Sequence, residues 1–377
     1  MQLGRVFGIR IGVSVSWFVF FGLLIFWLTE FFQRMIGGSV QTAFFVAVAG
    51  AIGYFASLVL HELGHALVAR RLGIPVRGID LWFLGGLSQM DREPETAGEE
   101  LRVAAAGPAV TALLLVGCIA ASVLVTGSNG AREVVLAREI GTATPAIALV
   151  GWLGFVNAML LFFNILPAFP LDGGRIARAA IWARTGDRNR ATRATGYAGR
   201  GLALVVGLFG LWALASAGSL LAVLTLIVAF FIWQAAGAAV VQGTVGRRIQ
   251  SLTVSDVMDT EPVAIPSAMT LLDAQEQFFL RYRWPWFAVV DEASHYLGIL
   301  RANVVDGELA AGRPALSAGD MAETDAPVII KPGAPLESLL GAEGLGRLGA
   351  MVAVDADGVL QGIVTLAEIR RALRPAA

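Results

Sequence analysis

Two histidines and a glutamate lie within one five-residue stretch, His61-Glu62-Leu63-Gly64-His65. On a helix, residues four positions apart share one face, so both imidazoles could bind a single Zn²⁺ through ring nitrogens. Glu62 would lie beside them and could accept a proton from an attacking water without being a ligand. The pattern predicts a hydrolytic zinc site with His61 and His65 as metal ligands and Glu62 as catalytic base.

The surroundings of this motif strengthen the prediction. The motif lies inside a long apolar run, Val40 to Ala69, and holds two of the three histidines in the chain. A charged side chain at the centre of a membrane costs about 2.5–3.5 kcal/mol on insertion scales, so such residues are usually functional. A short pattern with two free positions also occurs by chance, and the motif by itself does not decide between function and coincidence.

A catalytic zinc usually has three protein ligands and one water, so a third ligand is required. The candidate is Asp172, at the end of a later apolar run, in the segment Asn164-Ile-Leu-Pro167-Ala-Phe-Pro170-Leu-Asp172-Gly173-Gly174. The prolines remove amide donors, and the two glycines permit backbone conformations closed to other residues. Irregular backbone at membrane depth is tolerated where it is buried in protein or lines a polar cavity. The alternative is an ordinary helix end followed by an Asp-Gly turn.

The composition indicates a membrane protein. Of the 377 residues, 56% are hydrophobic and 15% are charged, and the mean hydropathy is +0.70, which is too apolar for an average soluble domain. The long apolar runs end near Val245, whereas residues 251–377 have ordinary globular composition. The net charge of −1 and the absence of a dense basic stripe give no case for nucleic-acid binding. The single cysteine, Cys118, excludes an internal disulfide framework.

We predict six membrane spans, each near the ~20 residues needed to cross ~30 Å of hydrocarbon. No small-residue cleavage site convincingly follows the first apolar run, which favours a retained span over a signal peptide. Arginines gather before the first span, after the second, after the fourth and after the sixth. By the positive-inside rule, both termini are expected in the cytoplasm. The predicted spans cover about residues 11–32, 40–69, 103–126, 145–168, 201–217 and 220–241.

Residues 74–91, between the second and third spans, alternate apolar and polar side chains around the pair Gly85-Gly86. This pattern predicts a β-hairpin. A free strand edge near a metal site would allow an unwound peptide to bind as an added strand. A connecting hairpin with no role in binding is the alternative.

Taken together, the motif in the second span and the Asn-Pro-Pro-Asp-Gly pattern after the fourth resemble the site-2 protease family of intramembrane zinc metalloproteases, peptidase M50. The resemblance covers about residues 1–245 and implies a polytopic α-helical fold with one catalytic Zn²⁺ held by His61, His65 and Asp172. The family often has Asn a few residues after its Gly-Pro, where this chain has Thr111, and we expect Asn157 to supply comparable polarity. Supporting roles in the site or in substrate binding are implied for Gly85, Gly86, Gly107, Pro108, Asn164, Pro167 and Pro170.

The second half of the chain contains two similar units with a period of about 65 residues, which indicates an internal duplication. Both units end in a buried strand, Phe287–Asp291 or Met351–Asp355, followed by a Gly-Ile pair. They resemble a tandem pair of cystathionine β-synthase (CBS) domains, at residues 251–310 and 317–374. The resemblance implies a soluble α/β module that packs as a pair, commonly dimerises and commonly binds adenine nucleotides between its repeats.

In the CBS family the nucleotide ribose is bound by Thr or Ser followed three residues later by Asp. The second repeat has Thr365 and Glu368 at these places, whereas the first has Arg301 and Val304. We therefore predict an adenine-nucleotide site at Thr365 and Glu368, with a purely structural or dimerising role as the alternative. His295 is expected to be an exposed turn residue.

The predicted function is regulated intramembrane proteolysis. The protein would cleave a peptide bond within or beside a membrane-spanning segment of another protein, near the cytoplasmic leaflet, and the cytoplasmic CBS pair would modulate its activity. One alternative is a CBS-regulated channel or transporter with a structural or degenerate metal site, although the spans show no inverted repeat. A soluble-type zinc protease tethered to a membrane is disfavoured, because the motif lies in the apolar run itself.

Overall fold

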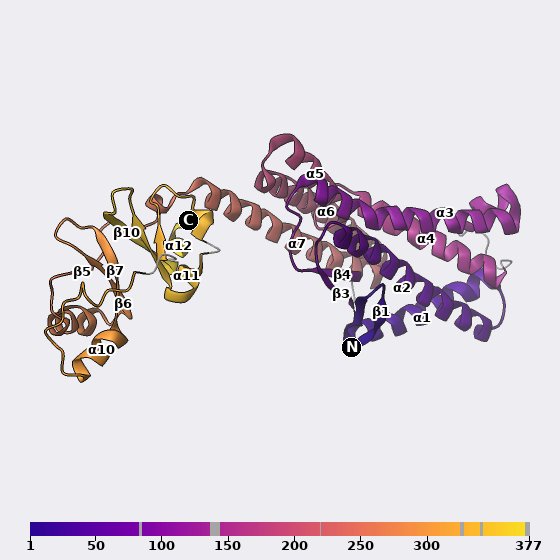
Figure 1. Ribbon diagram of the computed structural model, residues 1–377. Coiled ribbons are helices and arrows are strands. Elements are labelled where there is room, and N and C mark those ends of the chain that lie inside the picture. Colours follow the sequence, from indigo (N-terminus) through magenta and orange to yellow (C-terminus); the bar gives the residue numbers. More distant parts are fainter. Residues whose placement is uncertain (83–84, 136–143, 219, 325–327, 340–341, 374–377) are drawn as a thin grey trace. The chain divides into compact units, whose positions relative to one another are not determined.

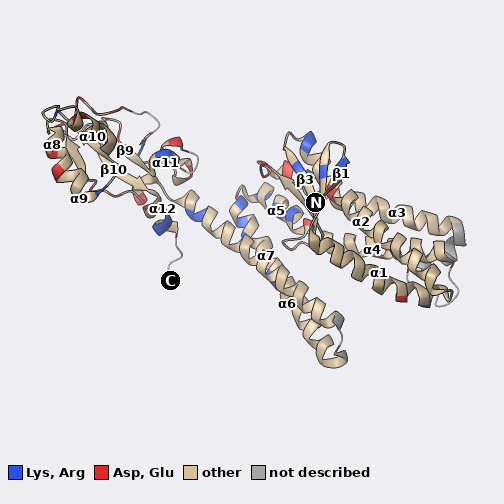
Figure 2. Cartoon of the chain, turned by 90° about the horizontal axis from the view of Figure 1, so that it is seen from below, with Lys and Arg blue, Asp and Glu red and all other residues tan. Residues whose placement is uncertain are grey.

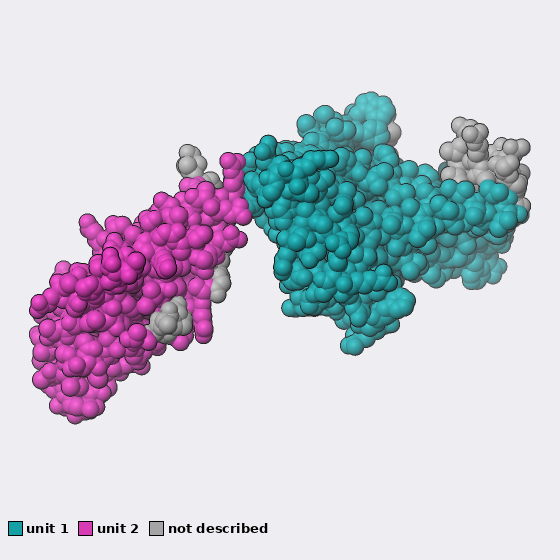
Figure 3. All heavy atoms as spheres, turned by 45° about the horizontal axis from the view of Figure 1, so that its top comes forward, with its two compact units in different colours: residues 1–243 teal, residues 244–377 magenta. Residues whose placement is uncertain are grey.

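The computed structural model describes residues 1–82, 85–135, 144–218, 220–324, 328–339 and 342–373. The chain divides into two compact units, residues 1–243 and residues 244–377 (Figure 3). Unit 1 is mostly helical and carries both motifs of the predicted metal site, and unit 2 is a mixed α/β module (Figure 1).

Six helices of the described chain are long and apolar enough to cross a membrane, which agrees with the six predicted spans. Most of them pack side by side in unit 1 (Figure 1), and the long polar-ended helix α7 continues into the start of unit 2. Their bounds are α1 Val15–Ile36, α2 Val40–Arg71, α3 Ala97–Val135, α4 Pro145–Ile165, α6 Arg188–Ala217 and α7 Leu220–Ser251.

The first span begins later than predicted. Residues 9–13 form strand β2 (Ile9–Val13), which pairs with β1 (Gln2–Val6), and helix α1 follows Ser14. The reason is the alternation in this segment: Ile9, Ile11 and Val13 are buried on one face, and this period of two belongs to a strand. In the sequence this strand is continuous with the apolar run of the first span. The change from the two-residue period of a strand to the period of a helix was therefore not recognised.

A four-stranded sheet with the order β1-β2-β3-β4 covers α2 at one end. Strands β3 (Val76–Trp82) and β4 (Gly85–Met90) are antiparallel and form the predicted hairpin, which therefore belongs to a larger sheet. Gly85 and Gly86 lie in β4, and residues 83–84 are outside the described part. Ile79 and Leu81 pack against α2, and β4 is an edge strand in the described sheet.

Charged side chains of unit 1 gather at the sheet and around the short helix α5 (Asp172–Thr185), whereas α2, α3 and α4 are uncharged along most of their length (Figure 2). Helix α2 ends at this charged side with Arg70 and Arg71, and His65 lies close to that end.

Helix α5 was not predicted. Its sequence is polar on one side, so it carries no apolar run by which a membrane span is recognised.

Unit 2 contains two three-stranded sheets of the same topology, in which the first two strands are parallel and the last two antiparallel. This repeated topology agrees with the predicted internal duplication. The helical segment of the first repeat consists of α8, a π-helical turn at Gln275–Phe279, and α9. Within the predicted second repeat, residues 325–327 and 340–341 lie outside the described residues. The elements are β5 Ala264–Pro266, α8 Leu271–Ala274, α9 Leu280–Tyr282, β6 Trp286–Val290, β7 Tyr296–Arg301, α10 Ala302–Ala310, β8 Ile329–Ile330, α11 Glu343–Leu348, β9 Ala350–Val354, β10 Leu360–Thr365 and α12 Leu366–Leu373.

Candidate metal centre

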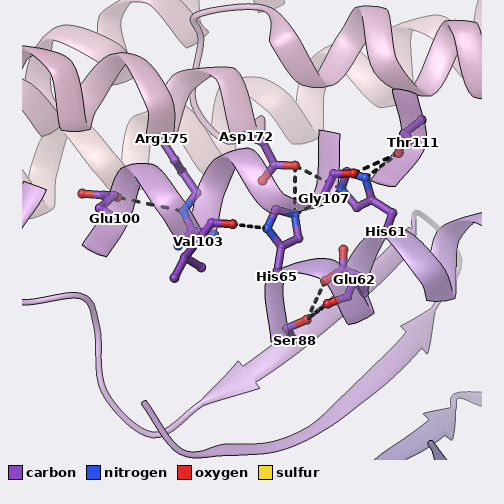
Figure 4. Close-up of polar contacts among 10 residues, drawn as sticks. All are labelled: His61, Glu62, His65, Ser88, Glu100, Val103, Gly107, Thr111, Asp172 and Arg175. Carbon is purple, nitrogen blue, oxygen red and sulfur yellow. Dashed lines mark hydrogen bonds and ion pairs between the residues drawn. The ribbon is translucent and has the colours of Figure 1, made fainter. Parts of the chain in front are cut away.

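Three potential ligand atoms meet in the interior of unit 1 (Figure 4). Asp172 Oδ2 lies 3.0 Å from His61 Nε2 and 3.1 Å from His65 Nε2, and the two nitrogens are 3.2 Å apart. All three side chains are buried. The histidines come from adjacent turns of α2, and Asp172 is the first residue of α5, so residues more than a hundred positions apart converge on one point.

Hydrogen bonds to helix α3 determine which ring nitrogens face this point. His65 Nδ1 lies 2.7 Å from the carbonyl oxygen of Val103, which can only accept, so Nδ1 carries the proton and donates. Thr111 Oγ1 donates to the carbonyl of Gly107 at 3.2 Å, and it accepts from His61 Nδ1 at 2.9 Å. In both neutral rings the unprotonated nitrogen is therefore Nε2, which points toward Asp172.

This arrangement fits a zinc ion. Two imidazole lone pairs and one carboxylate oxygen face one another within 3.2 Å and would repel each other unless a cation lay among them. Ligand atoms in a tetrahedral site with zinc–ligand bonds of about 2.0–2.1 Å are about 3.3 Å apart, close to the separations found here. Imidazole and carboxylate are the donors that catalytic zinc uses.

Helix α3 approaches the imidazoles closely because residue 107 is glycine. A Cβ atom at Gly107 would lie 2.2 Å from His65 Nε2 and 2.8 Å from His61 Cε1. Val103, Gly107 and Thr111 lie on successive turns and thus on one face of α3. Pro108 lies inside the same helix and is buried. Thr111, which sequence analysis noted only as a departure from the family, orients His61 directly.

Asn157, expected to replace the family's Asn, lies elsewhere. Its Nδ2 donates to Ser57 Oγ at 3.1 Å and to the carbonyl of Leu153 at 2.8 Å. It therefore joins α4 to α2 one turn before His61, and Thr111 makes the contact with the imidazole. Asn164 lies in the last turn of α4.

The two glycines after Asp172 have a different use from the one predicted. Both lie in α5, and neither has a positive φ, so their conformational freedom is not needed. A Cβ at Gly173 would lie 2.4 Å from the carbonyl of Ile165, and one at Gly174 would lie 2.5 Å from the backbone of Ala168. The absence of side chains lets the α4–α5 connection, which contains Pro167 and Pro170, fold against the first turn of α5. Asp172 thus begins a separate helix and does not end the fourth span.

Glu62 lies beside the two histidines and contacts strand β4 (Figure 4). Ser88 Oγ donates to Glu62 Oε2 at 2.7 Å. A Cβ at Gly86 would lie 2.5 Å from Glu62 Cγ, so a glycine is required where the strand crosses this side chain. Ser88 was not among the predicted site residues. Its position two residues after Gly86, on the same face of the predicted strand, was the available signal.

A cavity in unit 2 is lined by both repeats, with Trp284 and Trp286 from the first and Thr365 and Glu368 from the second. Glu368 Oε2 accepts hydrogen bonds from the amide and the hydroxyl of Thr365, at 2.8 and 3.0 Å, so the predicted ribose-binding pair is joined across the start of α12.

The corresponding position of the first repeat is engaged elsewhere, because Arg301 pairs with Glu323 at 3.0 Å. His295, expected to be exposed, is only partly so. Its Nδ1 lies 2.9 Å from Asp291, and this hydrogen bond lowers the pKa of that carboxyl group below its usual value.

Comparison with known proteins adds independent evidence. The sequence matches the family model of peptidase family M50 over residues 49–208 and that of the CBS domain over residues 254–303. Rip3 of Mycobacterium tuberculosis is 31% identical over 377 residues, which cover 98% of this chain and 92% of that protein. The protein sll0528 of Synechocystis is 29% identical over 304 residues, 80% of this chain and 76% of its own. Both carry names that class them as zinc metalloproteases. The solved structure of a site-2 protease from Methanocaldococcus jannaschii is 29% identical and covers 64% of this chain and 94% of its own, with a TM-score of 0.43.

Proposed function

The chain belongs to peptidase family M50 and is a zinc metalloprotease of the membrane, and on this premise we propose that it hydrolyses a peptide bond within or beside a membrane-spanning segment of another protein. The observation that carries the proposal is the buried cluster of three acceptor atoms from His61, His65 and Asp172, with Glu62 beside it. We assign the metal-ligand role to the first three residues and the role of catalytic base to Glu62. The channel or transporter alternative does not agree with membership of a peptidase family.

The chemistry divides between the metal and the protein. Zinc bound by the three ligands would polarise the scissile carbonyl and lower the pKa of the attacking water to about 7. Glu62 takes the proton from this water and then delivers it to the leaving amide nitrogen. Val103 and Thr111 hold the imidazoles with Nε2 inward, and Ser88 holds one oxygen of the base.

The substrate has to be extended at the cut site, because the amides of a transmembrane helix are hydrogen-bonded to one another and shielded from attack. Strand β4 supports such a step: it is the edge strand of the described sheet, and its Ser88 contacts Glu62. We propose that the unwound segment of a membrane protein pairs with β4 and so presents its backbone beside the base.

The distribution of charge supports an orientation in the membrane. The end of unit 1 that holds α5 and the sheet carries most of its arginines (Figure 2), and arginines favour the cytoplasmic side. We propose that both termini and the CBS module are cytoplasmic and that the site lies near the cytoplasmic leaflet. The released fragment would then enter the cytoplasm, as in regulated intramembrane proteolysis.

We further propose that residues 1–245 are the protease domain and that residues 251–310 and 317–374 are two CBS domains that modulate it. The proposal is supported by the family match over 254–303 and by the repeated sheet topology of unit 2. The cavity that contains Thr365 and Glu368 is the candidate site for an adenine nucleotide. A homodimer formed through the CBS domains is part of the same proposal.

Substrate trapping tests the proposed function. Glu62→Gln keeps the size of the side chain and leaves the ligands intact but removes the base. Expressed in the protein's own cells, this variant should retain bound zinc and accumulate uncleaved single-span membrane proteins that the wild type cleaves. Glu93→Gln, which changes an exposed glutamate outside the site, is the matched control and should behave as the wild type. Cleavage by purified Glu62→Gln protein at the wild-type rate would exclude the assigned mechanism.

A further inference from the structure

One buried ion pair near the metal centre has no part in the mechanism above. Glu100 of α3 is completely buried, and Arg178 of α5 is 7% exposed. Arg178 Nε donates to Glu100 Oε1 at 2.8 Å, and its Nη2 contacts the same oxygen. Arg175, one turn earlier on α5, also approaches Glu100, with its Nε 4.0 Å from Oε1 (Figure 4).

Stability alone is a poor reason for such a pair. The desolvation free energy of two buried charges is about as large as the free energy gained from their attraction. A buried ion pair therefore often gives a protein no more stability than well-packed apolar side chains would. Here the carboxylate is poorly satisfied as well, because Glu100 Oε2 has no hydrogen-bond partner among the described residues. The position of the pair offers a better explanation.

The pair joins the two helices that organise the metal centre. On α3, Glu100 lies one turn before Val103, on the face that also carries Gly107 and contacts the imidazoles. On α5, Arg178 belongs to the helix whose first residue is Asp172. Helix α5 follows an irregular connection and packs against α3 and α6, so its contacts with α3 contribute to its rotation and axial position.

We propose that Glu100 and Arg178 form a positioning pair that sets the Asp172 carboxylate against the two imidazoles and thereby controls metal affinity and ligand geometry. The guanidinium presents two N–H groups in a rigid fork to one oxygen, so it fixes the angle of α5 as well as its distance from α3. A lysine would keep the charge but not the angle. The proposal rests on the assignment of Asp172 as a metal ligand.

The test uses the purified full-length protein in detergent, with zinc and cobalt as the probes. Zinc affinity is measured by competition with a chromophoric chelator, and the visible absorption of the Co²⁺ form reports ligand geometry. Arg178→Lys should weaken zinc binding by about tenfold or more, as is typical when a residue that orients a ligand is lost, and should change the cobalt spectrum. Arg188→Lys, which alters the exposed pair with Glu93, is the control and should change neither.

The double variant Glu100→Leu/Arg178→Met separates positioning from stability. It removes both charges and fills similar volume, so we expect the metal-free variant to melt near the temperature of the metal-free wild type. The same variant should bind zinc weakly and show an altered cobalt spectrum. Wild-type zinc affinity and spectrum in this variant would overturn the proposal. Failure of the variant to fold would overturn it as well, because the pair would then be a requirement of the fold.

Asp172→Asn distinguishes this proposal from the function on which it rests. If Asp172→Asn binds zinc as the wild type does, the ligand assignment fails and the positioning role fails with it. If Asp172→Asn loses zinc but Arg178→Lys and the double variant do not, only the positioning role fails.

Discussion

Ser88 Oγ donates a hydrogen bond of 2.7 Å to Glu62 Oε2, and it is this contact that connects the edge strand β4 to the side chain assigned as catalytic base. The strand passes close enough that Gly86 leaves no room for a Cβ beside Glu62. A peptide that pairs with β4 would therefore lie beside the base, and any shift of the strand would move the carboxylate. Substrate binding and orientation of the base are thus properties of one element.

Ser88→Ala should reduce the cleavage rate by about tenfold or more without loss of zinc, because a hydrogen bond to a charged group contributes about 1.5–3 kcal/mol. Cleavage of a trapped substrate and zinc content would be measured on the same purified sample. Gln89→Ala removes the neighbouring exposed side chain, which contacts Asp80, and serves as the control. A wild-type rate in Ser88→Ala would show that Glu62 does not depend on the strand.

Gly107→Ala should abolish zinc binding, because its methyl group would occupy space within 2.2 Å of His65 Nε2. Metal content by atomic absorption is the direct measurement. Gly117→Ala lies on the same helix with open space around its Cβ and should retain one zinc per chain. Retention of zinc by Gly107→Ala would mean that α3 does not approach the imidazoles as described.

Thr111→Val should weaken zinc binding by about tenfold, since the buried Nδ1–H of His61 would lose its acceptor at a cost of about 1–3 kcal/mol. Thr111→Ser retains the hydroxyl and should keep most of the affinity. Chelator competition compares the two variants. Equal affinities would indicate that the hydroxyl has no part in orienting the ring.

Removal of zinc with a chelator should stop proteolysis and lower the melting temperature, and added zinc should restore both. A ligand at a concentration of 1,000 times its dissociation constant stabilises the folded state by about 4.1 kcal/mol. The melting temperature of Asp172→Asn should respond much less to the chelator. An equal response in wild type and variant would place the stabilising ion at another site.

Part of this protein follows from local sequence. The spacing of His61 and His65 puts both rings on one helix face, and apolar runs near the length of a bilayer identify the six spans. The alternation over residues 74–91 predicted the hairpin, and the repeat in the second half predicted an internal duplication. These properties depend on residues close together in the chain, for which the period of the side chains is sufficient.

Other features required the tertiary structure. Helix α5 has no strong apolar signature, and β2 is continuous in sequence with the apolar run of the first span; both elements were missed, as was β1. The convergence of Asp172 on the two histidines, the proton positions imposed by Val103 and Thr111, and the contact of Ser88 with Glu62 join segments far apart in sequence. Spacing along the chain cannot specify such contacts, because they depend on how the helices and the sheet pack against one another. The sequence by itself therefore determined which residue types the site contains. Only the packing of α3 and β4 against α2, and of α5 against α3, decided how they are held.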